Sequence, residues 1–122
     1  MRSNLKLVVP GGVARAESYE LVGPIAEASL AGLNLDLVFV GVDGIGTDAG
    51  CTTHHEVEAY TNRALIKRAR RSIVVADGSK LGRVAFARIC TLDEIDELIT
   101  DQGGDRAELD ALADAGLLVT TV

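Results

Sequence analysis

Apolar residues gather in short runs separated by turn residues, a pattern that predicts strands. Residues 5–9 (LKLVV) alternate and then run apolar, and the Pro-Gly-Gly triplet at 10–12 ends the run. Residues 35–42 (LDLVFVGV) and 72–76 (SIVVA) are nearly continuous apolar sequence, and Asp-Gly follows each of them. Runs of this length favour strands that are buried on both faces, as the strands of a parallel sheet usually are.

Shorter apolar stretches predict further strands later in the chain. Residues 97–100 (ELIT) predict a small strand, and residues 117–122 (LLVTTV) predict a closing one. Residues 84–89 fit either a short strand or a helical turn, and residues 18–22 are ambiguous.

Capping residues mark the expected helices. Gly23-Pro24 opens a short helix, since proline suits the first helical position, and Gly32 and Asn34 end it. The strongest helix signal spans Glu56 to Arg71. It has acidic residues in its first turn, basic residues in its last and Thr53 as a possible cap.

Two later segments also begin with capping signals. Thr91, followed three residues on by Glu94, resembles the start of a capping box. Asp105 is expected to cap a last helix that runs through Ala115, with Gly116 as its stop.

The order of these elements predicts the fold class. Strands that alternate with helices imply an α/β domain, with a mostly parallel sheet flanked by helices and joined by right-handed crossovers. Residues 44–53, rich in Gly, Thr and Asp, are expected to form a long loop, and loops of that length are often functional. Residues 1–122 show no internal repeat or linker, so we expect a single domain.

Composition narrows the classes of function. Hydrophobic residues make up 48% of the chain and aromatic residues 3%, so Val, Ile, Leu and Ala must form the core. The net charge of −6 argues against a nucleic-acid-binding domain, which usually carries a basic stripe. The basic cluster at residues 67–71 is interpreted as a solvated helix end. No apolar run approaches the length needed to span a membrane.

The reactive side chains give little support to metal or thiol chemistry. Cys51 and Cys90 are too few for a disulfide framework and are interpreted as free thiols in a reducing cytoplasm. Cys51, His54, His55 and Glu56 could suggest a metal site, but their spacing is not that of a standard zinc site and no second ligand pair follows. We therefore expect no metal and no cofactor, and we do not expect Cys51 to be a nucleophile.

Polar residues follow both of the predicted buried strands. Asp43-Gly44 comes after residues 35–42, and Asp77-Gly78-Ser79-Lys80 comes after residues 72–76. If the two strands are neighbours, Asp43, Asp77 and Lys80 converge where ligands of open parallel sheets bind. Lys80 would then offer a cation and the aspartates would accept hydrogen bonds. On spacing alone, two ordinary turns are the more probable reading.

Several motifs, taken in order, resemble one family. Residues 35–45 (LDLVFVGVDGI) look like the D-x-x-F-x-G-x-x-G-I strand of the DeoR-type transcriptional regulators. Thr52-Thr53, and then Glu58-Ala59 opening a helix, keep that family's order. Residues 73–82 (IVVADGSKLG) are similar to its L-A-D-x-S-K-F-G, and residues 98–101 match its L-I-T-D. The resemblance runs over nearly the whole chain.

The resemblance implies a fold and a function. The C-terminal domain of that family is similar to ribose-5-phosphate isomerase and the CoA transferases, and it binds phosphorylated sugars or related metabolites. An N-terminal helix-turn-helix domain binds DNA, and the metabolite changes the hold of the repressor on its operator. Residues 1–122 contain no helix-turn-helix, and they lack the glycine- and threonine-rich loop expected to hold the phosphate. The chain is therefore expected to be a sensor domain that is incomplete at its N-terminus.

The resemblance also indicates which residues contact the effector. Asn62, one turn after Glu58, is expected to face the same pocket. The expected effector-binding residues are Asp43, Gly44, Thr52, Thr53, Glu58, Asn62, Asp77, Ser79 and Lys80.

The isomerase comparison bears on catalysis. The leading aspartate of its D-G-A-D-E motif is Val40 here, although Asp43 survives, and residues 48–52 replace its lysine-glycine loop. The resemblance implies that Glu58 corresponds to the helix glutamate of the isomerase and that Lys80 corresponds to the last lysine of its D-E-S-K motif. Isomerisation needs a general base and groups that stabilise an enediolate, and two of these polar partners are missing. The pattern indicates a binding pocket rather than an enzyme, with no catalytic residue.

Three hypotheses remain open at this point. The chain is the metabolite-sensing part of a cytoplasmic repressor, a sugar-phosphate isomerase-like enzyme, or an oligomerisation remnant without a ligand. In the first case its partner is a small anionic metabolite, and the chain itself contacts neither nucleic acid nor membrane. An incomplete domain leaves sheet edges and apolar surface uncovered, so we expect a homo-oligomer.

Overall fold

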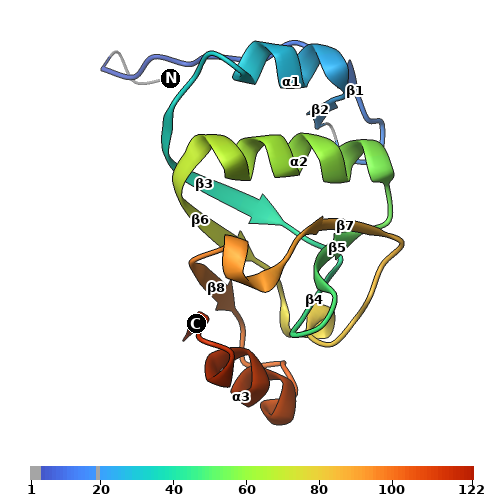
Figure 1. Ribbon diagram of the computed structural model, residues 1–122, viewed down its shortest axis with the longest axis vertical. Coiled ribbons are helices and arrows are strands. Elements are labelled where there is room, and N and C mark those ends of the chain that lie inside the picture. Colours follow the sequence, from blue (N-terminus) through green and yellow to red (C-terminus); the bar gives the residue numbers. More distant parts are fainter. Residues whose placement is uncertain (1–3, 19) are drawn as a thin grey trace.

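A four-stranded parallel sheet forms the centre of the computed structural model, which describes residues 4–18 and 20–122 (Figure 1). Its strands, in spatial order, are β3 (Leu35–Gly41), β6 (Ala69–Val75), β8 (Glu97–Thr100) and β9 (Leu118–Thr121). The predicted α/β class with a mostly parallel sheet is confirmed. The register pairs Gly41 with Val75, so β3 and β6 end side by side.

Two small antiparallel sheets accompany the parallel one. One pairs β1 (Val13–Ala14) with β2 (Leu21–Val22), and the other joins β4 (Gly44–Gly46), β5 (Gly50–Thr53) and β7 (Ala87–Cys90). The expectation of a loop over residues 44–53 is therefore wrong. Those residues form a hairpin, because β5 pairs with both β4 and β7, and pairing across two neighbours outweighs the weak strand propensity of glycine.

The helices begin where local chemistry places them. α1 spans Pro24–Leu30 with Pro24 in its first turn, as predicted, and α2 spans Glu56–Arg68. α3 spans Arg106–Asp114, and the predicted cap Asp105 accepts a hydrogen bond of 2.9 Å from the Ala107 amide. Two 3₁₀ turns, η1 (Gly78–Lys80) and η2 (Leu92–Glu94), complete the set. The capping box of Thr91 and Glu94 is confirmed.

The predicted end of α2 is wrong by one turn. Ala69 adopts an extended backbone and pairs with Leu35, so β6 starts directly after Arg68. Arg71 thus lies on a strand, where it donates a hydrogen bond of 2.7 Å to Glu97. Thr53 does not cap the helix, because it belongs to β5 and His55 occupies the cap position.

The strand predicted for residues 5–9 is absent. These residues pair with no strand among those that the structure describes, and Leu7 and Val9 are exposed by 69% and 65%. An alternating pattern indicates that a segment can form a strand, but a hydrogen-bonded neighbour is needed to make it one.

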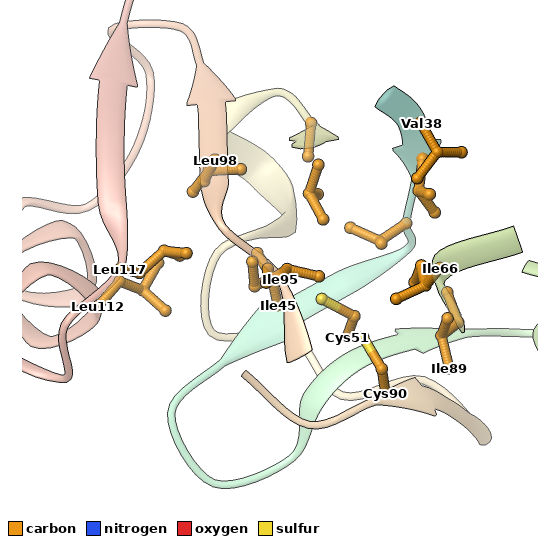
Figure 2. Packing of buried hydrophobic residues seen from close by; sticks show 14 of the residues in the cluster. Val38, Ile45, Cys51, Ile66, Ile89, Cys90, Ile95, Leu98, Leu112 and Leu117 are labelled. Carbon is orange, nitrogen blue, oxygen red and sulfur yellow. The ribbon is translucent and has the colours of Figure 1, made fainter. Parts of the chain in front are cut away.

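Burial of β3 is one-sided, contrary to expectation, whereas β6 buries both Ile73 and Val74, which face opposite sides of the sheet. Val38 and Val40 of β3 are buried, whereas Leu37 and Phe39 are exposed by 44% and 61%. Val75, on the neighbouring strand, is exposed by 47%. The core therefore lies on one face, between the sheet, α2, α3 and the β4–β5–β7 sheet (Figure 2). Its members include Val38, Val40, Ile45, Ala59, Ile66, Val74, Leu81, Ile89, Leu98 and Leu112.

Candidate functional site

A small cavity opens beyond the carboxyl end of β3, where ligands of open parallel sheets are expected. Its volume is about 200 Å³. The structure brings the predicted residues Asp43, Thr53 and Glu58 together in it, from the end of β3, the end of β5 and the first turn of α2. The full lining is Glu20, Gly41, Val42, Asp43, Thr53 and Glu58.

Asp43 is held as an ionised acceptor in this cavity. Its Oδ2 accepts a hydrogen bond of 2.8 Å from the Thr53 hydroxyl and one of 3.1 Å from the His54 amide. Burial by itself would raise the pKa of Asp43, but these two hydrogen bonds outweigh it, and the pKa is lowered. The Asp43 amide also donates to the Thr52 carbonyl at 2.9 Å, which ties the end of β3 to β5.

Glu58 forms an ion pair that the sequence did not reveal. Its Oε2 accepts a hydrogen bond from Nη1 of Arg15, and the two side chains are only 12% and 15% exposed. Arg15 directly follows β1, and its amide donates to the Glu20 carbonyl at 2.9 Å. Neither Arg15 nor Glu20 was predicted, because residues 18–22 carry an ambiguous pattern and no motif singles out either charge.

Glu20 adds a third carboxylate beside Asp43 and Glu58. Burial raises the pKa of Glu20, and the neighbouring Glu58 carboxylate raises it further. The cavity is therefore crowded with acceptors of hydrogen bonds.

Gly44 and Thr52 support the site without lining the cavity. A Cβ on Gly44 would lie 2.2 Å from the Arg83 carbonyl oxygen, so only glycine allows this approach. The Thr52 hydroxyl accepts a hydrogen bond of 2.9 Å from the Ala85 amide. Both residues hold the segment after η1 against β4 and β5, which is a structural role.

Asn62 faces a different cavity from the one predicted. It is buried, and with Pro10, Leu21 and Phe39 it lines a cavity of about 340 Å³. This space shares Glu20 and Gly41 with the acidic cavity, so the two adjoin.

Asp77 and Ser79 lie at a separate place, beyond the end of β6. Both are exposed, and Asp77 caps η1 by accepting from the Ser79 amide at 2.9 Å and from its hydroxyl. The Ser79 hydroxyl lowers the pKa of Asp77, as does the Ser79 amide. Asp77 also lines a shallow groove of about 220 Å³ with Thr100 and Asp101.

Lys80 connects the two places electrostatically. Its charge lowers the pKa of both Asp43 and Asp77, beside the stronger effect of their hydrogen bonds. The structure does not bring Asp43, Asp77 and Lys80 together in one site as expected, because the two aspartates face different spaces and Lys80 lines neither of them.

Asp101 links two of the sequence motifs. Its Oδ1 accepts from the Gly78 amide at 3.0 Å and from the Gly103 amide at 2.9 Å. A Cβ on Gly78 would lie 2.2 Å from the Gly104 nitrogen, so the turn at residues 101–104 packs directly on η1. These contacts give a physical reason why the Asp-Gly-Ser-Lys and Leu-Ile-Thr-Asp motifs occur in the same chain.

The cysteines are part of the core. Cys51 and Cys90 are paired across β5 and β7 and fully buried, and Figure 2 shows them next to each other. Hydrogen bonding to Cys90, followed by burial, raises the pKa of Cys51, so this thiol is protonated at neutral pH. Within residues 4–18 and 20–122, no group of three or more potential ligands could hold a metal ion. No helix there is long and apolar enough to cross a membrane.

Comparison with known proteins identifies the family. Residues 1–102 match the family described as the DeoR C-terminal sensor domain, and the chain belongs to it. The family is one of sensor domains of transcriptional regulators, in line with the expectation of a binding domain rather than an enzyme.

Three curated relatives illustrate the relationship. The HTH-type transcriptional regulator GlpR of Haloferax volcanii is 38% identical over 89% of this chain and 43% of its own length. The HTH-type transcriptional repressor GlcR of Bacillus subtilis is 35% identical over 98% of this chain and 46% of its own. The glycerol-3-phosphate regulon repressor of Escherichia coli is 26% identical over 83% of this chain and 40% of its own. The chain spans less than half the length of each.

Proposed function

We propose that this chain is the ligand-sensing portion of a DeoR-type repressor of sugar metabolism. In this proposal it binds a phosphorylated sugar or a related small anionic metabolite in the cavity lined by Asp43, Thr53 and Glu58. The observation that carries the proposal is the ionised Asp43 carboxylate, oriented by Thr53 and His54 at the carboxyl end of β3. The E. coli relative is named for the glycerol-3-phosphate regulon, and glycerol 3-phosphate is a phosphorylated polyol.

The chemistry of the cavity suits such a ligand. Carboxylate oxygens accept hydrogen bonds from sugar hydroxyl groups, and the cavity presents those of Asp43 and Glu58. Lys80 adds positive charge that lowers the pKa of Asp43, although it does not line the cavity. A polyol with one anionic substituent would match the acceptors of the cavity, and a cation beside them would balance its charge.

Signalling requires a second domain. We propose that effector binding here changes the affinity of a helix-turn-helix domain, elsewhere in the whole cytoplasmic repressor, for its operator. Two of the relatives carry the helix-turn-helix class in their names. The net charge of −6 favours a sensor that makes no direct nucleic-acid contact of its own.

Thermal shift against a panel of sugar phosphates, each paired with its unphosphorylated sugar, tests the proposal. A ligand that binds only the folded chain raises its melting temperature. We expect at least one sugar phosphate to do so. Asp43→Asn should abolish the shift, whereas Asp36→Asn, the same change of charge at an exposed position of β3, should leave it intact. A shift that survives Asp43→Asn would remove this cavity from the proposal.

We propose in addition that the chain forms a homo-oligomer. Leu37, Phe39 and Val75 expose apolar surface on the open face of the parallel sheet, and β3 is an edge strand of that sheet. Both features favour association. Light scattering at micromolar concentration should give a mass above that of one chain, and Phe39→Lys should lower it. A monomeric wild type would refute this part of the proposal.

A further inference from the structure

The ion pair of Arg15 and Glu58 differs from the other ion pairs among the described residues. Its side chains are 15% and 12% exposed, whereas those of Arg63 and Glu94 are 36% and 29% exposed. A buried pair strongly constrains both partners, because a charge left unpaired there is costly. Exposed pairs contribute little. Glu58 therefore depends on Arg15 for an opposite charge at this point, whereas Arg15 also contacts the exposed Glu17 at 3.4 Å.

The pair stands between two hollows of the surface. Glu58 lines the acidic cavity with Asp43, while Arg15 lines a neighbouring cavity of about 450 Å³. The lining of that second cavity comes from the short β1–β2 sheet, the start of α1 and the first turn of α2, and it includes Gly23, His55 and Val57. A ligand entering from either side meets the pair at the boundary.

The charges around the pair are unbalanced. Glu20, Asp43 and Glu58 line the acidic cavity, and the only side-chain cation recorded in an ion pair with any of them, within the described residues, is Arg15. A planar guanidinium binds two oxygens of a phosphate group in a two-pronged arrangement, which a single carboxylate oxygen does not provide. An entering phosphate group is thus a strong competitor for Arg15.

We propose that Arg15 is the anion-binding residue of the effector site and that Glu58 is its counter-ion while the site is empty. The anionic group of the effector takes the place of Glu58 on the guanidinium, and the released Glu58 carboxylate accepts hydrogen bonds from the hydroxyl groups of the ligand. This inference rests on the proposed function, because it assigns the residue that recognises the anion there.

Two substitutions with opposite expected effects test the inference, with inorganic phosphate as the probe at constant ionic strength. Arg15→Gln should weaken phosphate binding by about tenfold or more, since it removes the guanidinium. Glu58→Gln should strengthen binding by several-fold, since it removes the competing charge. Arg63→Gln, which breaks the more exposed pair of Arg63 and Glu94, should leave the affinity unchanged. Titration calorimetry measures all three.

Loss of folding is separated from loss of binding by a conservative change. Arg15→Lys keeps the charge and gives up the two-pronged geometry, so it should fold like the wild type and bind phosphate with intermediate affinity. A purely structural pair predicts instead that Arg15→Gln and Glu58→Gln alter phosphate binding in the same direction. That result, or no phosphate binding by wild type and Glu58→Gln alike, would overturn the inference.

The inference and the proposed function can fail separately. If sugar phosphates bind and Asp43→Asn abolishes binding, but Arg15→Gln has no effect, the sensor function stands and the role of Arg15 falls. If phosphate binds through Arg15 but no sugar phosphate binds more tightly than phosphate, the role of Arg15 stands and the sugar-sensing function falls.

Discussion

Asp43-Gly44 and Asp77-Gly78 follow neighbouring parallel strands and look alike in the sequence, yet the structure uses them differently. The Asp77 carboxylate bonds to Ser79, two residues away, and thereby closes its own turn. The Asp43 carboxylate bonds to Thr53, ten residues away on another sheet, and to His54, which directly follows that strand. Asp43 therefore borders a cavity, whereas Asp77 is exposed on a turn.

The difference shows what converts a turn signal into a candidate site. Each aspartate accepts two hydrogen bonds on a single oxygen, so the number of bonds does not distinguish them. They differ in what holds them: Asp43 is oriented by a distant segment and lines a cavity, whereas Asp77 is held by its own turn and is exposed. The interpretation that spacing alone favoured, an ordinary turn, describes Asp77 well and Asp43 poorly. The glycines, in contrast, have the same task in both places, since each allows another backbone segment to approach closely.

The largest expected effect concerns these glycines. Gly44→Ala and Gly78→Ala each place a Cβ 2.2 Å from a backbone atom, so each should destabilise the fold by about 1–3 kcal/mol through overpacking. Gly32→Ala, with no atom within 4 Å of the added Cβ, serves as the control. Urea unfolding measures the difference. Equal stability of all three variants would show that the close approaches do not matter in solution.

We expect substitutions of the two aspartates to differ in their cost to stability, although substitutions of the two glycines do not. Asp43→Ala removes a charged acceptor of two hydrogen bonds, and we expect it to cost about 1–2 kcal/mol of unfolding free energy. Asp77→Ala removes an exposed cap and should cost clearly less. Urea unfolding of the two variants side by side checks the order, and the reverse order would break the distinction drawn between them.

Acid should reveal the ionised state of Asp43. Its pKa in the folded state lies below the ordinary value of 3.8, so the stability it contributes is present above that pH. That stability is lost as the pH falls through the lower folded-state pKa. Asp43→Asn should therefore lose stability less steeply than the wild type between about pH 4 and pH 2. Thermal melts across this range measure the slopes, and parallel slopes would contradict the prediction.

The smallest effect tests the crowding of carboxylates around Asp43. The pKa of Glu20 is raised above its ordinary value of 4.5, so its favourable contribution is present below that pH and is lost as the pH rises through the folded-state pKa. Glu20→Gln should slightly raise the melting temperature at pH 7 and have no effect at about pH 4. Glu27→Gln, at a partly buried position of α1, is the control and should change neither.

Much of the fold was predictable because its signals are local. Pro24 in the first turn of α1, Asp105 as a cap and the Thr91–Glu94 box each depend on residues within one turn of the chain. The central strands followed from their apolar runs. The errors arose where a distant partner decides. The strand expected at 5–9 has no hydrogen-bonded neighbour among the described residues. Residues 44–53, expected to be a loop, form strands because β5 pairs with β4 and β7.

The candidate site was predictable in part. Asp43, Thr53 and Glu58 were expected together from the order of the family motifs, and the structure places them in one cavity. Arg15 and Glu20 were missed. Arg15 matters because it contacts Glu58 of α2, and more than thirty residues lie between the two in the chain. No periodicity or short motif reports such a contact.

By itself, the sequence determined the caps, the apolar strands and the family, since these depend on backbone geometry and side chains close together in the chain. Tertiary structure alone decided which face of β3 is buried, that Thr53 orients Asp43, and that Arg15 meets Glu58. The physical reason is that a carboxylate or a guanidinium takes its pKa and its availability from the groups around it in space, and long-range packing places those groups.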